Sequence, residues 1–258
     1  MKAQPDVRPL APTLSPEYEG GGVARSFAPT VPARPGSQSP PHRSKIVNYT
    51  RITCALVAVA WAGAVTFGTS RLWTYESTPG TPARAPVAWP ADSSVVRRPG
   101  VPMLVLFAHP QCPCSRATVG ELAKLMTDCR GKLSATVLML RPAGVQDGWE
   151  RTDLWNSAAA IPGVSVVSDA GASESRRFGA VTSGQVLLFA PDGRLLFSGG
   201  ITESRGHRGD NAGRSAVAAL VLGTGRVAQP VFAPVYGCPL FNTSSSCLTE
   251  GTPACHKK

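Results

Sequence analysis

The segment at residues 103–129, MLVLFAHPQCPCSRATVGELAKLMTDC, constrains the chain most, because it joins three structural signals in a fixed order. The apolar run Met103–Ala108 predicts a buried strand. A short polar turn then carries Cys112 and Cys114. Apolar residues recur after the turn at helical spacing, which predicts an amphipathic helix over Pro113–Asp128. The two cysteines are therefore expected where a strand meets the N-terminus of a helix.

That position has a defined chemistry. Unpaired backbone N–H groups and the helix dipole place partial positive charge at a helix N-terminus. This field stabilises a thiolate, and thiol pKa values there fall from about 8.5 to below 7. A thiolate is both the nucleophile of disulfide exchange and a soft metal ligand, so Cys112 and Cys114 indicate either chemistry. The alternative is that both are small buried residues or partners in structural disulfides.

The first hundred residues are predicted to lie outside the compact domain. Residues 1–50 are rich in proline and polar residues, bury too little apolar surface to fold, and are expected to be disordered. Residues 51–71 are predicted to form one membrane-spanning helix, because the uncharged stretch 52–70 would rise about 28 Å, close to the roughly 30 Å hydrocarbon core. Residues 72–100 are Pro-rich again and predict a semi-extended spacer. A buried helix of a soluble protein is the alternative for the span.

Charge and cysteine content predict where the chain resides. Arg43, Lys45 and Arg51 precede the span, which favours an N-terminus in the cytoplasm and a C-terminal domain across the membrane. Seven cysteines fit an oxidising, extracytoplasmic compartment, where disulfides persist. The net charge of +10 comes from scattered basic residues without a nucleic-acid motif, so nucleic-acid binding is not predicted. Nothing in the sequence predicts an oligomeric state.

Residues 101–224 are predicted to form one α/β domain. Apolar runs and helical patterns alternate along it, which implies a mixed sheet with helices on both faces. A Pro-Asp-Gly turn near residue 192 predicts a hairpin, and Asp210 is expected to cap the last helix. Strands are expected at 103–108, 134–140, 164–167, 186–189 and 195–198, and helices at 113–128, 148–160, 172–178 and 210–222.

Residues 225–258 show no periodicity and predict an irregular tail held by covalent links. It contains Cys238, Cys247 and Cys255, which with Cys129 allow three disulfide connectivities. A buried free thiol is an equally good interpretation of Cys129, which ends a helix on its apolar side.

This order of elements resembles the thioredoxin fold over about residues 101–224. The resemblance is carried by Phe107-Ala-His-Pro-Gln-Cys112, by the stretch from Asp169 to Phe178-Gly179, and by the Pro-Asp-Gly-Arg hairpin at 191–194. The phrase FSGGITESRGH at 197–207 is similar to a bacterial branch labelled RedB. The resemblance implies a membrane-anchored thiol–disulfide protein of the bacterial inner membrane, with a periplasmic domain that acts on protein thiols and disulfides without a cofactor.

Two positions depart from the pattern of the resembled family. That family usually has Cys-x-x-Cys, whereas here Ser115 stands at the resolving position and Cys114 comes one place early. It also has a cis-proline that faces the cysteines, and Gly184 falls at that place. These departures change the resolving geometry and the surface for substrate docking, and they leave the nucleophile in place.

As a redox pair, Cys112 would attack and Cys114 would resolve, with Pro113 at the first helical position, where its missing N–H costs no hydrogen bond. Cysteines at i and i+2 close a small strained ring, so their disulfide would be easily reduced and a good donor of oxidising equivalents. The favoured hypothesis is a membrane-tethered, extracytoplasmic thiol–disulfide oxidoreductase. Cys238 is either a third redox cysteine that exchanges with the pair or, as the sequence favours, a static bridge partner.

A copper carrier is the second hypothesis, since two thiolates with His109 and His207 would suit Cu(I). Copper-handling members of the resembled fold use two cysteines and a histidine, with wider cysteine spacing. His109 has the alternative role of shaping the turn, and His207 that of an exposed loop residue. Zinc lacks a complete tetrahedral set, and a peroxidase would have Thr or Ser where His109 stands. The third hypothesis is a redox-silent interaction module.

Overall fold

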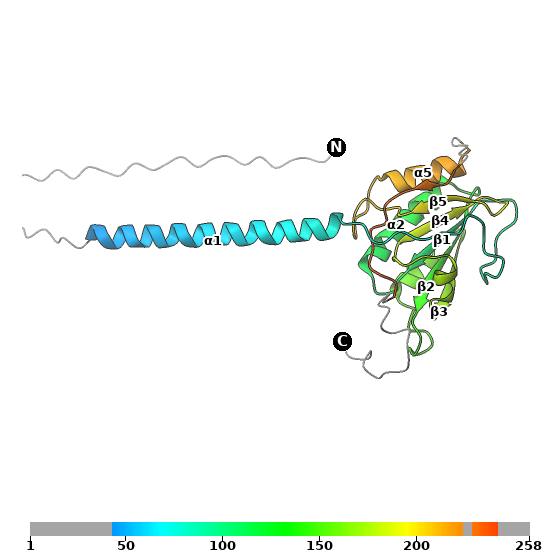
Figure 1. The fold of residues 1–258 in the computed structure, drawn as a ribbon, viewed down its shortest axis with the longest axis horizontal. Coiled ribbons are helices and arrows are strands. Elements are labelled where there is room, and N and C mark those ends of the chain that lie inside the picture. The colour runs from blue at the N-terminus through cyan, green and yellow to red at the C-terminus, as the bar shows by residue number, and fades with distance from the viewer. Residues whose placement is uncertain (1–42, 224–228, 242–258) are drawn as a thin grey trace, which may run out of the picture. The chain divides into compact units, whose positions relative to one another are not determined.

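A computed structural model describes residues 43–223 and 229–241 of the chain (Figure 1). Within these residues a six-stranded sheet has the order β3-β2-β1-β4-β5-β6. The elements along the chain are α1 (Arg43–Ser77), β1 (Met103–Ala108), α2 (Pro113–Asp128), β2 (Ser134–Arg141), α3 (Asp153–Ala159), β3 (Val164–Ala170), α4 (Ser173–Arg177), β4 (Gln185–Phe189), β5 (Leu195–Gly199), α5 (Ala212–Val221) and β6 (Val231–Phe232).

The central strand β1 connects the parallel and antiparallel parts of the sheet. It pairs in parallel with β2 and antiparallel with β4, while β2 continues in parallel to β3 and β4 in a hairpin to β5. Connections through α2 and α3 precede the parallel partners, as parallel strands require. The arrangement confirms the predicted thioredoxin-like mixed α/β sheet, preceded by one apolar helix.

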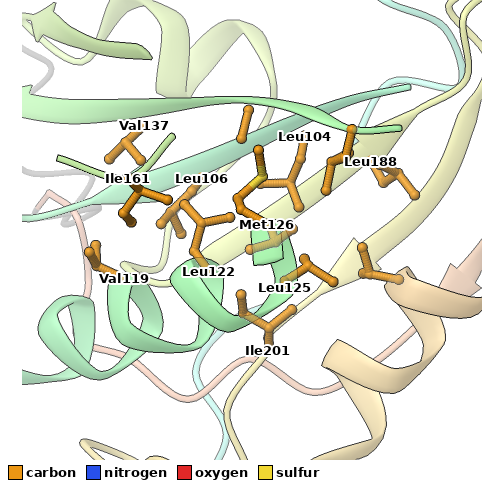
Figure 2. Packing of buried hydrophobic residues seen from close by; sticks show 14 of the residues in the cluster. Leu104, Leu106, Val119, Leu122, Leu125, Met126, Val137, Ile161, Leu188 and Ile201 are labelled. Carbon is orange, nitrogen blue, oxygen red and sulfur yellow. The ribbon is translucent and has the colours of Figure 1, made fainter. Parts of the chain in front are cut away.

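Side chains of β1 alternate between two hydrophobic cores, because successive residues of a strand point to opposite faces. Leu104 and Leu106 face a core built with α2, α3 and α5. Figure 2 shows them beside Leu122 and Met126 of α2. Val105 and its odd-numbered neighbours face the second core, next to the residues that flank α4. Both faces of β1 are thus buried, and its C-terminal end is held rigidly at the start of α2.

Most of the predicted spacer, from Gly80 onward, packs onto this domain. The Gly80 N–H donates to the Val235 carbonyl at 2.7 Å, only three residues after α1 ends. The Trp89 ring meets Phe178 and Phe189 edge-on, each with ring centroids 5.1 Å apart. Residues from 80 onward therefore belong to the domain, and several of them pack in its second core.

The helix α1 contains one candidate membrane span. Residues 48–77 form 30 residues of helix, and an 18-residue window within them has a mean hydropathy of 1.7. The helix extends beyond the predicted 51–71 at both ends, while its most apolar part lies within that range. The predicted disordered tail at 1–50 lies mostly outside the described residues, as do Cys247 and Cys255.

Two helix starts differ from the sequence prediction. Gly148 has φ +85°, and the Arg151 N–H donates back to its carbonyl at 2.9 Å, so a turn replaces the first predicted turn of α3. The prediction of Asp210 as the cap of α5 was wrong. The Asn211 side chain accepts the Arg214 N–H at 2.7 Å, and the Asp210 carboxylate pairs with the Arg214 guanidinium instead.

Replacing the N-cap residue of α5 should lower the free energy of unfolding measurably. Asn211→Ala leaves the Arg214 N–H without its acceptor, and we expect the free energy of unfolding to fall by about 1 kcal/mol. Asp210→Ala, which removes one surface ion pair, should cost less than about 0.5 kcal/mol. Urea unfolding of both variants in detergent, followed by tryptophan fluorescence, would contradict the assignment if the order were reversed.

Candidate functional site

Cys112 occupies the N-cap of α2, directly beyond β1. Its backbone is extended, with φ −95° and ψ 123°, and its N–H donates to the His109 carbonyl at 3.1 Å to close the turn. The helix begins at Pro113, as predicted. A proline is tolerated there because the first helical N–H has no partner within the helix.

Three thiols meet at this point. The Sγ atoms of Cys112, Cys114 and Cys238 all lie within 4.8 Å of one another, and each cysteine is free. Cys112 is 7% exposed and Cys114 3% exposed, while Cys238 is half-buried. The pair that the sequence predicted is therefore joined by a cysteine from the C-terminal tail, far away in the chain.

The protonation of the three thiols is unequal. The Cys114 S–H, which donates to the neighbouring sulfur, lowers the pKa of Cys112 to about 4, with a smaller contribution from the Ser183 hydroxyl and against the opposing effect of burial. The same hydrogen bond, burial and the Cys112 thiolate raise the pKa of Cys114. Burial raises the pKa of Cys238, and the negative charge of Cys112 adds to the effect. At neutral pH the site thus holds one thiolate, on Cys112, and two thiols.

The loop before β4 supplies the other wall. Ser183 is fully buried, and its hydroxyl lies 3.4 Å from the Cys112 Sγ and accepts the Cys238 N–H at 3.1 Å. Gly184 has φ +85°, a conformation that favours glycine, and a Cβ there would lie 2.9 Å from the Thr118 hydroxyl oxygen. Its N–H donates to the Phe107 carbonyl at 2.7 Å. Where the resemblance implied a cis-proline, this chain has a glycine that allows α2 to approach closely.

The tail at 229–241 has little regular secondary structure beyond β6, but backbone pairing fixes its course. After β6 pairs with β5, the chain returns antiparallel to the loop before β4. The Ser183 N–H donates to the Cys238 carbonyl at 2.8 Å, and the Leu240 N–H donates to the Val181 carbonyl at 2.8 Å. Backbone hydrogen bonds, rather than a covalent link, hold this part of the tail.

Neither predicted histidine belongs to the cluster of three thiols. The Nδ1 atom of His109 accepts the Gln111 N–H at 3.2 Å, and its ring meets Trp149 edge-on at 5.8 Å. Burial lowers the pKa of His109. His207 is exposed, and within residues 43–223 and 229–241 the only cluster suited to a metal ion is formed by the three cysteines. The Ser115 hydroxyl accepts the His109 N–H at 3.0 Å and so stabilises the turn before α2.

Sequence reasoning missed three residues of this site. Ser183 contacts two of the cysteines, as described above. Arg205 donates from Nε to the Tyr75 carbonyl at 3.0 Å, donates to the Gly237 carbonyl, and lies over the Tyr75 ring at 5.0 Å. The Tyr75 hydroxyl and the Arg205 charge both act to lower the pKa of Cys238, against the larger effect of burial. The only sequence signal was that Arg205 lies within the phrase at 197–207 on which the RedB resemblance rests.

No family model and no curated protein matches the chain. Solved structures give similarities at low identity. A hypothetical protein from Sinorhizobium meliloti is 23% identical, with 63% of this chain and 93% of that chain covered and a TM-score of 0.44. An uncharacterized conserved protein from Geobacillus kaustophilus is 18% identical, with 66% and 94% covered and a TM-score of 0.46. A secreted disulfide oxidoreductase of Mycobacterium tuberculosis, described as homologous to E. coli DsbE, is 13% identical, with 48% and 83% covered and a TM-score of 0.35. At these identities the function is argued from the site itself.

Proposed function

We propose that this chain is a membrane-tethered, extracytoplasmic thiol–disulfide oxidoreductase with Cys112 as its nucleophile and Cys114 as the first resolving cysteine. The observation that carries the proposal is the Cys112 thiolate at the N-terminus of α2, with a pKa near 4 and a hydrogen bond from the Cys114 thiol. Thiolates of this kind are typical of exchange-active cysteines. The substrates are thiols and disulfides of proteins, and the exchange needs no cofactor.

The electrostatics favour oxidation of partners. A partner thiolate attacks Cys112 Sγ of the oxidised pair, the Cys112–Cys114 bond breaks, and Cys114 leaves and takes up a proton because its pKa is high. A second partner thiolate then attacks the partner sulfur of the mixed disulfide, and Cys112 leaves as a stable thiolate. Two partner thiols become one disulfide, and the Cys112–Cys114 disulfide is reduced. Stabilisation of the reduced form by the low pKa of Cys112 makes such a couple oxidising.

The membrane setting is part of the proposal. The candidate span in α1, with basic residues before it, supports an N-terminus in the cytoplasm and a domain in the periplasm of a bacterial inner membrane. A disulfide donor would work there, because that compartment keeps disulfides oxidised. The RedB-type resemblance stays a prediction.

A redox titration tests the proposed function. The full chain in detergent micelles is equilibrated in glutathione buffers, alkylated, and mapped by peptide mass spectrometry. We expect Cys112 to pass reversibly between a free thiol and a disulfide within the range of cellular redox potentials. The same titration of Cys129→Ser should be unchanged, because Cys129 is a buried thiol at the other end of α2. A Cys112 that stays reduced throughout would contradict the proposal.

A second candidate function is favoured by the sulfur cluster. Three thiolates within 4.8 Å of one another suit Cu(I), which prefers soft ligands, and Cys238 would take the ligand place that the sequence prediction gave to histidine. Under this alternative the reduced chain binds one Cu(I) against a competing chelator. Binding should be lost in Cys238→Ser and kept in His109→Ala, and equal losses in both variants would contradict the three-sulfur site.

A further inference from the structure

We propose that the tail segment 236–240 occupies the place of a partner peptide. Cys238 replaces Cys114 as the disulfide partner of Cys112, and the Cys112–Cys238 disulfide closes the site. This inference rests on the proposed function, because it requires Cys112 to exchange. It goes beyond that function by giving the chain a third working thiol and a closed oxidised state.

The first support is the way the tail is held beside the nucleophile. The tail pairs antiparallel with the loop before β4 through two backbone hydrogen bonds, from Ser183 to Cys238 and from Leu240 to Val181. Extended peptides commonly bind proteins by pairing with an exposed backbone edge in this way. Here the chain's own tail fills that edge and presents a cysteine to Cys112.

The second support is the closeness of the fit on both sides of Cys238. A Cβ at Gly237 would lie 1.7 Å from the Ser183 carbonyl oxygen, so only glycine allows the tail to lie so close to the loop. The Arg205 guanidinium donates to the Gly237 carbonyl. The Ser183 hydroxyl joins the two reactive residues, since it contacts the Cys112 sulfur and accepts the Cys238 N–H. Cys238 is therefore placed by contacts that reach it from several elements.

The exchange step is balanced without an outside reactant. The Cys238 thiolate attacks Cys112 Sγ of the Cys112–Cys114 disulfide, the Cys112–Cys238 bond forms, and Cys114 leaves as a thiolate. The proton that Cys238 loses ends on Cys114, and no net oxidation or reduction occurs. The step relieves the small ring of cysteines at i and i+2, because Cys112 and Cys238 are distant in sequence and close in space.

The third support is the burial of the nucleophile. Cys112 is 7% exposed while the tail lies against it, so a protein partner needs the tail to give way before it reaches the sulfur. A Cys112–Cys238 disulfide would lock the tail in place, whereas in the reduced state only hydrogen bonds and packing hold it, so that it can give way to a partner. The tail would thus make access to Cys112 depend on the redox state of the site.

The decisive variant is Cys114→Ser, studied as the full chain in detergent micelles with a glutathione buffer as oxidant. Chymotrypsin cleaves after Tyr236 and Phe241, which separates Cys238 from the later tail cysteines. We expect an intramolecular Cys112–Cys238 disulfide in most of the oxidised variant. Cys112 held as a glutathione mixed disulfide, with Cys238 free or linked to another cysteine, would overturn the inference and leave the proposed function standing. A Cys112 that takes up no glutathione and forms no disulfide would overturn both.

A second variant tests the closure. Gly237→Ala places a methyl group against the Ser183 carbonyl, so we expect the tail to be displaced and alkylation of Cys112 by iodoacetamide at pH 7 to become at least about tenfold faster. Gly68→Ala in α1 is the matched control, because a Cβ there meets nothing within 4 Å and its φ is not positive. A rate in Gly237→Ala equal to that of the control would show that the tail does not cover Cys112.

Discussion

At pH 5 Cys112 of the reduced chain is expected to react with a small activated disulfide about 30-fold faster than an ordinary thiol, and this fast reaction should be absent from the Cys112→Ser variant. With a pKa near 4, about nine-tenths of Cys112 is thiolate at pH 5, whereas an ordinary thiol with a pKa near 8.5 is about 0.03% ionised. The gain of roughly 3,000-fold in thiolate is reduced about 100-fold by the lower nucleophilicity of a weakly basic sulfur. The expected rate advantage of Cys112 over an ordinary thiol is therefore about 30-fold.

The rate of this reaction should fall as the pH is lowered through the pKa of Cys112. The rate should be nearly constant from about pH 5 to pH 8 and should fall below pH 5, with a midpoint near pH 4, because protonation of Cys112 removes the nucleophile. Cys114→Ala removes the strongest hydrogen bond to the thiolate and should therefore move the midpoint upward. The other thiols of the site contribute little, since the pKa values of Cys114 and Cys238 are raised.

Stopped-flow kinetics with a pyridyl disulfide over pH 3–9 would measure both effects. Cys129→Ser is the control and should keep the wild-type profile, because burial raises the pKa of Cys129 and the thiol is 1% exposed. A wild-type midpoint near pH 8.5, or equal rates for wild type and Cys112→Ser at pH 5, would contradict the assignment of Cys112 as the stabilised thiolate.

Glu121→Ala is expected to lower the free energy of unfolding by about 3–5 kcal/mol. The Glu121 carboxylate is fully buried on α2, 3.1 Å from the Arg214 Nε of α5, and it accepts the Gly209 N–H at 3.0 Å. Arg214 is only 15% exposed, and the variant leaves its guanidinium with the exposed carboxylates of Asp128 and Asp210 alone. Removing one member of a buried pair costs more than the pair itself contributes.

Glu121→Ala should also disturb the thiol site, through Arg205. Glu121 fixes the end of the loop that carries Arg205, and Arg205 donates to the tail at Gly237. Lys124→Ala is the matched control, because it removes an exposed partner of the same carboxylate and should cost less than about 0.5 kcal/mol. Urea unfolding in detergent would measure the two variants, and similar costs for both would show that the buried contacts of Glu121 contribute little.

The sequence predicted those parts of the fold that depend on local pattern. The apolar run of β1, the helical spacing of α2 and the turn at Gly193 were sufficient to predict a strand, a helix and a hairpin at the right places. Cys112 could likewise be assigned to a helix N-terminus, because strand and helix signals meet within a few residues.

The rest of the site depends on contacts between distant segments. Trp89 follows several prolines and gives no sign that it packs on Phe178, which lies 89 residues later (178 − 89). Cys238 lies in a stretch without periodicity, and its contacts in the loop before β4 are backbone groups and one serine hydroxyl, which leave no pattern in the sequence. The copper hypothesis took a histidine ligand from the resembled fold, and the sequence could not show that the His109 ring meets Trp149 edge-on.

The chain contacts the domain within a few residues of the end of α1, and this limits how the proposed oxidoreductase would meet its partners. Only Thr78 and Pro79 separate the end of α1 from Gly80, whose N–H is already bonded to Val235 of the domain. A long flexible tether would let the domain search a wide volume, whereas so short a connection leaves little reach. In a membrane, the thiols would therefore stay close to the bilayer surface. Neighbours anchored in the same membrane would then encounter them by lateral diffusion in two dimensions, and soluble proteins would have to come to the surface to be oxidised.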